Sequence, residues 1–486
     1  MIVTITIIGN KTELEIKVER GKLLSDALRL GHIHIDMPCA GKGICKSCEV
    51  LVNGEKRLVC QTKLEHDIRV QLADYSDLNN ITADKLVASP PVNPMYSRYG
   101  ISIDIGTTTL CASLLDRDGQ SVTTTRKNPQ RNFGADVISR IEKALIGEAS
   151  ELARCVRASL AEMAEELCAN RGIAPELIDA AVITGNTVMM YLLTAQNPAP
   201  LSRAPFQADR LFGEYVSAKA LGLPFSLSAT IYLPRCASAF VGGDITTAIL
   251  ASGMLNSTET ALLVDIGTNG EIALWHGDEL TCCSTAAGPA FEGAGISCGV
   301  YGVNGAIDRV WQKNGKICCS TIGGGQAVGI CGSGIVDALA VMLKLQIIDE
   351  TGAFEDGGSL KLPNGICITG QDVRKIQLAK GSVRAGVETL LESSGVDKAS
   401  VKILYIAGGF GNFLNLESAA IIGLIPKELQ NRANVLGNAA LSGASMLLTD
   451  KTLAESSEGF AALARTIALE ANPVFTENYM RYMMFE

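Results

Sequence analysis

The stretch ISIDIGTTTLCASLLDRDG at residues 101–119 decides the fold, because it recurs as LLVDIGTNGEIALWHGDE at residues 262–279. Each copy consists of an apolar run, an Asp-Ile-Gly-Thr string, polar residues, a second apolar run and an acidic glycine turn. The two copies are offset by 161 residues, counted from Asp104 to Asp265. Repetition at this interval predicts two similar halves that face each other across a cleft.

The residues around the repeat divide the chain into four parts. From Tyr99 onward, apolar runs typical of buried strands alternate with longer helical stretches, which indicates α/β architecture. Before that point, short alternating apolar runs with one short helix predict a small β-rich domain. A segment with three prolines and little periodicity separates the two regions and is typical of a linker. The predicted parts are the β-rich domain at 1–75, the linker at 76–98, the first half at 99–260 and the second half at 261–486.

Composition excludes several classes of protein. The chain has 486 residues, 47% of them apolar, and a formal charge of -9. No stretch clusters basic residues densely enough to follow a phosphodiester backbone, so nucleic acid is not an expected partner. The amino terminus lacks the features of a signal peptide, and no apolar run reaches the ~20 residues that span a bilayer. We expect a cytoplasmic protein that does not enter a membrane.

Four cysteines near the amino terminus have the spacing C-x5-C-x2-C-x11-C, at Cys39, Cys45, Cys48 and Cys60. Four thiolates can hold a [2Fe–2S] cluster when one loop wraps it and a distant fourth ligand closes the cage. Glycines at 41 and 43 permit the left-handed turns that aim amide groups at the sulfurs. Structural zinc is the alternative, although zinc sites generally pair two C-x2-C knuckles and this loop has one. The spacing resembles the adrenodoxin-like variety of [2Fe–2S] ferredoxin.

The eleven other cysteines are spread through the rest of the chain. Two adjacent pairs occur among them, and adjacent cysteines on a strand point to opposite faces. We therefore expect these side chains to be small buried apolar groups rather than ligands of a second cluster.

The repeated Asp-Ile-Gly-Thr string has the composition of a phosphate-binding hairpin. Backbone amides and Thr hydroxyls of such a turn can bind phosphate oxygens, while the Asp can hold Mg²⁺ through water. A third segment, Ile406-Ala-Gly-Gly-Phe-Gly, would let a nucleotide ring lie against the backbone. The candidates are Asp104 and Asp265 for Mg²⁺; Thr107, Thr108, Thr109, Gly267, Thr268 and Asn269 for phosphates; and Gly408, Gly409 and Gly411 for adenosine.

Further glycine-bearing strings are candidates for the cleft wall, although each could be only a turn or a helix cap. They occupy residues 184–187, 242–244, 288–294 and 331–334. Among their acidic residues and those of the repeat, Asp244 and Glu271 are the best candidates to orient water or metal, and Glu292 stands behind them. The three glycine motifs together resemble the phosphate-1, phosphate-2 and adenosine motifs of the superfamily of sugar kinases, heat-shock chaperones and actin (ASKHA). That resemblance implies two RNase H-like halves, MgATP in the cleft and closure coupled to hydrolysis.

The order of all motifs resembles that of the reductive activators of corrinoid proteins, over nearly the whole chain. The resemblance implies a β-grasp [2Fe–2S] domain followed by a duplicated ASKHA ATPase body. It further implies an enzyme that uses ATP to reduce a Co(II) corrinoid protein of a methyltransferase system to Co(I), with electrons from a low-potential donor. A homodimer is left open. This chain has only a short linker where larger members carry another domain.

Two alternatives remain at this point. One is a small-molecule kinase with a regulatory cluster, which would phosphorylate a sugar or carboxylate. The other is an ATP-gated electron carrier or activator for another metalloenzyme, as in systems resembling acyl-CoA dehydratase activators.

Overall fold

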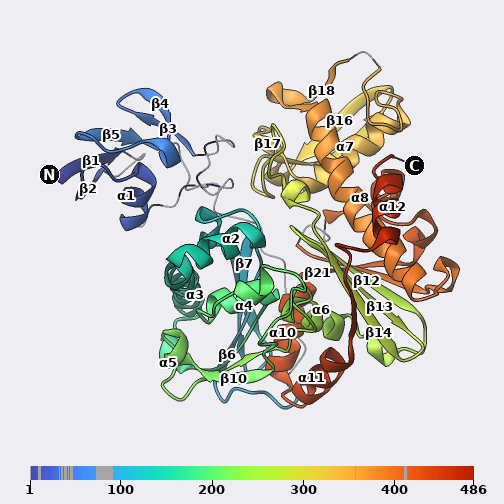
Figure 1. Cartoon of the computed structure of the whole chain (residues 1–486), viewed down its shortest axis with the longest axis horizontal. Helices are drawn as coiled ribbons and strands as arrows, with labels where there is room; N and C mark the ends of the chain where they lie inside the picture. Colours follow the sequence, from blue (N-terminus) through green and yellow to red (C-terminus); the bar gives the residue numbers. More distant parts are fainter. Residues whose placement is uncertain are drawn as a thin grey trace.

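The computed structural model describes residues 2–8, 13–31, 48–72, 91–355, 357–409 and 413–485, together with residues 33, 35, 37, 41 and 43 (Figure 1). The predicted site residues Cys39, Cys45 and Gly411 lie outside the described residues, as do residues 73–75 of the predicted amino-terminal domain and residues 76–90 of the predicted linker.

In its described residues the amino-terminal domain is a five-stranded mixed sheet with one α-helix. Val3, Ile5 and Ile7 are buried along one face of the first strand, as their alternation predicts. The strand order is β2-β1-β5-β3-β4, with β1 and β5 parallel, which fits the predicted β-grasp arrangement. The elements are β1 (Ile2–Ile8), β2 (Glu13–Glu19), α1 (Leu24–Leu30), β3 (Glu49–Val52), β4 (Glu55–Leu58), η1 (Val59–Gln61) and β5 (Ile68–Gln71).

The first half of the body is built on a six-stranded sheet of order β10-β11-β9-β6-β7-β8. Its strands are β6 (Tyr99–Ile105), β7 (Thr109–Asp116), β8 (Ser121–Lys127), β9 (Ile178–Gly185), β10 (Glu214–Ser217) and β11 (Thr230–Leu233). Its helices are α2 (Val137–Lys143), α3 (Ala149–Arg171), α4 (Thr187–Leu193), α5 (Ala218–Leu221) and α6 (Gly243–Ser252), with the 3-10 turn η3 (Pro129–Asn132) after β8.

The second half repeats this plan in a sheet of order β21-β20-β12-β13-β14-β22. Its strands are β12 (Ala261–Ile266), β13 (Gly270–His276), β14 (Glu279–Thr285), β20 (Ile403–Ala407), β21 (Ala433–Gly437) and β22 (Arg465–Ile467). Its helices are α7 (Gly332–Lys344), α8 (Gly370–Ser393), α9 (Leu416–Ile421), α10 (Ala439–Thr449), α11 (Leu453–Leu463) and α12 (Pro473–Tyr482). Small sheets of β15 (Ala306–Lys313), β16 (Lys316–Thr321) and β17 (Gly329–Ile330), and of β18 (Ser359–Lys361) and β19 (Cys367–Thr369), extend this half.

The duplication that the sequence predicts is present in the hydrogen-bond pattern. In each half three consecutive strands form an antiparallel meander, and a later strand pairs in parallel with the first of them. Asp104 pairs with Cys111 across the first hairpin, and Asp265 pairs with Glu271 at the equivalent place in the second. The two repeat strings therefore occupy the same position in two related α/β lobes, which confirms the predicted fold class.

The carboxyl-terminal part of the chain crosses back to the first lobe. Helix α10 follows β21 of the second sheet in sequence, but Ala444, Leu447 and Leu448 share one apolar cluster with Ala180 and Val182 of β9. Figure 1 shows α10 beside α6 between the two lobes. The predicted boundary at residue 260 thus separates the two sheets, but a helix from beyond that boundary packs against the first sheet.

The end of the predicted linker belongs to the body, contrary to expectation. Tyr96 is 2% exposed and donates a hydrogen bond to the Asp116 carbonyl at 2.8 Å. The Met95 amide donates to the Leu448 carbonyl at 2.9 Å. The prolines of this segment marked irregular backbone correctly, but irregular backbone can still be anchored by buried side chains.

A small cavity marks where the amino-terminal domain meets the body. It is lined by Asn132 of η3 and by residues of the amino-terminal domain, namely Ser25, Leu28, Ile33, Ile35, Met37 and Val59. The segment that contains Asn132 follows directly from the end of β8 in the first lobe.

The contact between α6 and α10 depends on the absence of a side chain at Gly443. A methyl group there would lie 1.9 Å from the Thr247 carbonyl oxygen, which is backbone and cannot rotate away. We expect Gly443→Ala to force the two helices apart. The substitution should lower the free energy of unfolding by about 1–3 kcal/mol. Thermal unfolding checks this expectation. Gly459→Ala is the control, because a methyl group at this α11 position meets no atom within 4 Å. Equal melting temperatures for the two variants would contradict the argument.

Candidate functional site

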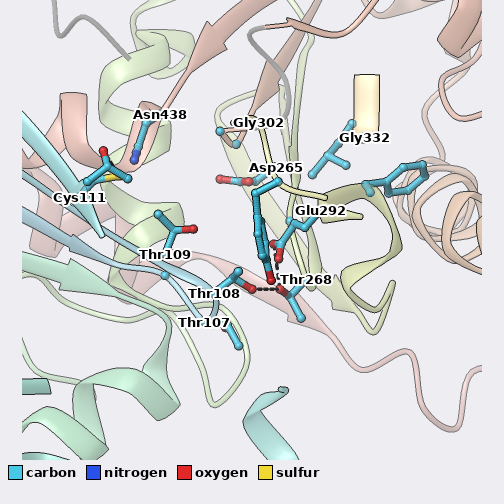
Figure 2. Close-up of a pocket in the computed structure, with 18 of the residues that line it drawn as sticks. Thr107, Thr108, Thr109, Cys111, Asp265, Thr268, Glu292, Gly302, Gly332 and Asn438 are labelled. Atoms are coloured by element: carbon cyan, nitrogen blue, oxygen red, sulfur yellow. Dashed lines mark hydrogen bonds between the residues drawn. The ribbon is translucent and has the colours of Figure 1, made fainter. Parts of the chain in front are cut away.

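One pocket between the two lobes collects the predicted nucleotide-site residues, some of which Figure 2 labels. The first lobe contributes Asp104, Thr107, Thr108, Thr109 and Asp244, and the second contributes Asp265, Gly267, Thr268, Asn269, Glu271, Glu292, Gly408 and Gly409. Residues from 331–334 also line it. The glycine-bearing strings that contain Asp244, Glu292 and Ser333 therefore line the pocket and are not turns elsewhere in the fold.

The two Asp-Ile-Gly-Thr hairpins meet in this pocket. The Thr108 and Thr268 hydroxyl oxygens, one from each lobe, lie 3.0 Å apart (Figure 2). The first hairpin is held from behind, because Asn128 Nδ2 donates to the Gly106 carbonyl at 2.8 Å and Arg140 Nη2 donates to the Thr107 carbonyl. A Cβ at Gly106 would lie 2.6 Å from the Thr109 carbonyl oxygen, so only glycine allows this tight turn. These contacts fix the first hairpin in the pocket wall, with Thr107, Thr108 and Thr109 lining the pocket.

The third glycine motif packs directly onto the second hairpin. Gly408 has φ of +96°. A Cβ there would lie 2.6 Å from the Ile266 carbonyl oxygen and 2.8 Å from Asp265 Oδ1. This close approach explains why the motif needs glycine and places its backbone at the pocket wall.

Four carboxyl groups line the pocket, three of them half-buried and that of Glu271 buried, and their pKa values are raised. Burial raises the pKa of Asp104 to about 6, although a hydrogen bond from Asn438 acts in the opposite direction. Burial and the charge of Asp104 raise the pKa of Asp265 to about 7. Burial, then Asp104 and Asp265, raise the pKa of Asp244 to about 8. The pKa of Glu271 is also raised, by burial and then by Asp244 and Asp265. A bound cation would reduce the repulsion between these carboxylates and so favour their ionised forms.

The cluster does not form a direct chelate. Among the described residues, no group of three His, Cys, Asp or Glu side chains is close enough to hold one metal ion. Mg²⁺ keeps several of its waters and is usually bound through one or two carboxylates and substrate phosphates. The donor set therefore fits Mg²⁺ that arrives with a nucleotide.

Several pocket residues were not predicted. Asn438 donates from Nδ2 to Asp104 Oδ2 at 3.0 Å and caps α10 by accepting from the Leu441 amide at 2.8 Å. Tyr301 of the second lobe carries Lys127 Nζ and the Arg131 guanidinium over its ring, 5.1 and 5.0 Å from the centroid. No motif in the sequence marks either residue. Asn186, which donates to Thr107 Oγ1 at 3.2 Å, does lie in the string at 184–187.

The described half of the cysteine loop has the geometry of converging ligands. Cys48 and Cys60 are both buried, and their sulfur atoms lie 3.3 Å apart. A disulfide needs about 2.05 Å, so these two sulfur atoms are close neighbours that are not bonded to each other. Gly41 and Gly43 have φ of +83° and +73°, as the cluster interpretation predicts. These residues fit an iron–sulfur cluster held by the loop.

The eleven remaining cysteines are less uniform than predicted. Five are buried, namely Cys168, Cys236, Cys282, Cys283 and Cys331. Six are partly exposed, namely Cys111, Cys155, Cys298, Cys318, Cys319 and Cys367, so the expectation of burial is wrong for them. Two of the set, Cys111 and Cys331, line the pocket.

Family models cover most of the chain. Residues 6–70 match the 2Fe-2S iron-sulfur cluster binding domain, residues 99–257 match the RACo middle region, and residues 259–486 match the C-terminal domain of RACo, the ASKHA domain. Fold and pocket therefore define a two-lobed ATPase of the ASKHA class joined to a ferredoxin domain. In the described residues, no helix has the length and apolar character needed to cross a bilayer.

Relatives identify the family within that class. The corrinoid activation enzyme RamQ of Eubacterium limosum is 30% identical over 583 aligned positions, which cover 97% of this chain and 98% of the relative. A [Co(II) methylated amine-specific corrinoid protein] reductase of Methanosarcina barkeri is 26% identical, over 73% of this chain and 70% of the relative. A solved reductive activator for corrinoid, iron–sulfur protein is 27% identical, with a TM-score of 0.75 over 99% of this chain and 98% of that one. This chain belongs to the family of reductive activators of corrinoid proteins.

Proposed function

We propose that this protein uses ATP binding and hydrolysis to drive the one-electron reduction of a Co(II) corrinoid protein to the Co(I) state. The observation that carries the proposal is that one chain combines two neighbouring buried cysteines with a pocket between two lobes, lined by the two Asp-Ile-Gly-Thr hairpins and by several carboxyl groups. Its relatives are a corrinoid activation enzyme and a corrinoid protein reductase, which supports the same partner.

The pocket residues divide by chemistry. Asp104 and Asp265 hold Mg²⁺ through water, since each ends a buried strand and faces the other lobe. Asp244 and Glu271 orient the attacking water or the metal. The Thr hydroxyls and turn amides of residues 107–109 and 267–269 bind phosphate oxygens. The backbone at Gly408 and Gly409, with Gly411 beyond them, lies beside adenosine.

ATP is needed because the electron transfer is unfavourable. A [2Fe–2S] cluster of the ferredoxin type supplies electrons near about -400 mV, and the Co(II)/Co(I) couple is expected to lie lower. Each 100 mV of deficit costs about 2.3 kcal/mol for one electron. Lobe closure on ATP can supply this only if the closed and open states differ in affinity for the corrinoid protein. An upstream low-potential donor then reloads the amino-terminal domain.

A reconstitution under anaerobic conditions tests the proposal. The full chain with its cluster, MgATP and dithionite is mixed with a purified Co(II) corrinoid protein of a methyltransferase system. We expect stimulated phosphate release together with growth of the Co(I) absorption band. A small-molecule kinase would show no Co(I) band but would phosphorylate a sugar or carboxylate. An activator of another metalloenzyme would show neither response to the corrinoid protein, and either result would contradict the proposal.

A further inference from the structure

Glu292 occupies the junction between the two phosphate-binding hairpins. Thr268 donates a hydrogen bond from Oγ1 to Glu292 Oε1 at 2.9 Å, and Thr268 Oγ1 lies 3.0 Å from Thr108 Oγ1. The Thr108 hydroxyl also bonds to the Glu292 side chain. Figure 2 shows the three side chains pointing toward one another from the two lobes. One carboxylate therefore joins the hydroxyls that the proposed function assigns to phosphate.

These hydroxyl protons are already in use. A Thr hydroxyl carries one proton, so it can donate one hydrogen bond at a time. The Thr268 proton goes to Glu292, and the Thr108 proton can go only to Thr268 or Glu292 within this trio. A phosphate oxygen accepts hydrogen bonds and cannot donate at neutral pH when it is ionised. A phosphate oxygen can therefore accept hydrogen bonds from these two hydroxyls only after their hydrogen bonds to the Glu292 carboxylate have broken.

We propose that Glu292 holds the place of the terminal phosphate of ATP while the pocket is empty, and that ATP, but not ADP, displaces it. This inference rests on the proposed function, because it assumes that Thr108 and Thr268 bind phosphate. An ionised carboxylate and a phosphate compete for the same donors and repel each other, so they cannot share the position. ADP lacks the phosphate that needs this position and leaves Glu292 where it is.

Glu292 is placed so that it can leave. Its second oxygen, Oε2, is buried and accepts no hydrogen bond from the described residues, so this position leaves one carboxylate oxygen unsatisfied. Burial raises the pKa of Glu292, while the hydrogen bonds from Thr108 and Thr268 and then the charges of Arg131 and Arg140 favour the ionised carboxylate. The two arginines lie on the first lobe and offer an alternative direction for the side chain.

The loop that carries Glu292 connects its position to the contact between the lobes. Gly288 and Gly293 flank it with φ of +77° and +80°, a backbone that only glycine adopts easily. A Cβ at Gly293 would lie 2.6 Å from the Val300 carbonyl oxygen, so this turn packs against the segment that precedes Tyr301. Tyr301 in turn lies under Lys127 and Arg131 of the first lobe. A movement of Glu292 would therefore also shift Tyr301 and its contacts with Lys127 and Arg131 between the lobes.

Calorimetric titration of nucleotides into the full chain with its cluster tests the proposal. The probes are MgADP and the Mg²⁺ complex of a non-hydrolysable ATP analogue, and the variant is Glu292→Gln, which keeps the shape and removes the charge. We expect the ATP analogue to bind about tenfold more tightly to the variant than to the parent, the factor that about 1.4 kcal/mol of lost competition gives. We expect ADP affinity to change less than about twofold. Asp337→Asn is the matched control, since this buried carboxyl accepts from Ser418 Oγ at 2.7 Å, outside the pocket, and should leave both affinities unchanged.

Two results would overturn the displacement. One is an equal change in affinity for ADP and for the ATP analogue, which would make Glu292 a general electrostatic or structural element. The other is unchanged affinity for both with a large loss of phosphate release, which would make Glu292 a base in hydrolysis. If the parent protein binds neither nucleotide, the proposed function itself fails, and the two failures are thereby distinguished.

Discussion

Asp265→Asn is expected to reduce ATP hydrolysis about a thousandfold while the iron–sulfur centre stays intact. Asp265 is half-buried in the pocket wall, where desolvation and then the charge of Asp104 raise its pKa. An amide of the same shape cannot balance the charge of Mg²⁺, and a correctly held metal is worth several kcal/mol in such reactions. Phosphate release measured against Mg²⁺ concentration, with and without the corrinoid protein, checks the expectation.

The same variant separates the two functional parts of the chain. Its visible absorption and iron content should match those of the parent, because residue 265 lies in the second lobe and the cysteine loop in the amino-terminal domain. Asp337→Asn again serves as the buried carboxyl control and should retain hydrolysis. Normal hydrolysis with an unchanged Mg²⁺ dependence in Asp265→Asn would remove this residue from the metal site.

Cys60→Ser is expected to produce the reverse pattern. Cys60 is 4% exposed and its sulfur lies 3.3 Å from that of Cys48, which is the position we propose for a cluster ligand. A serine oxygen is a harder and less easily ionised ligand than the thiolate that iron–sulfur clusters select. We expect loss of iron, of the red-brown colour and of all Co(I) formation, with nucleotide binding retained. Iron analysis, visible spectra bleached by dithionite and nucleotide titration measure the three outcomes.

Cys168→Ala controls for the loss of any buried cysteine. Cys168 is buried in the first lobe and should be replaceable without loss of iron or of Co(I) formation. Retention of a full complement of iron in Cys60→Ser would exclude this residue as a ligand. A colourless parent protein with stoichiometric zinc would instead favour the structural zinc alternative.

The duplicated body could be predicted from sequence because its signal is local. An apolar strand, an Asp, a tight Gly turn and a second strand lie within about twenty residues, and the same string fixes the same hairpin twice. The glycines at 41 and 43 were predictable for a similar reason, since their positive φ angles follow from the turn that the loop needs. Local backbone requirements of this kind leave a readable mark in the sequence.

Contacts between distant segments left no such mark. Asn438 is 334 residues away from Asp104, and nothing near either residue indicates that they bond. The position of Glu292 against Thr268 likewise depends on how the loop at 288–294 folds back over the second hairpin, and the sequence placed it only behind the other acids. The buried end of the linker escaped prediction because the Tyr96 site is completed by residues from both ends of the body.

The return of α10 to the first sheet has a consequence for how the chain is made. Ala180 and Val182 are covered in part by Ala444, Leu447 and Leu448, so the apolar face of the first lobe is incomplete when its own residues have left the ribosome. Nearly two hundred further residues must be translated before α10 emerges, which takes on the order of 10–40 s at typical elongation rates. During that interval the nascent first lobe exposes the apolar face that α10 later covers. Slow or stalled synthesis in this part of the messenger should therefore favour aggregation, and chaperones that bind nascent chains should matter more for this protein than for one whose lobes fold in order.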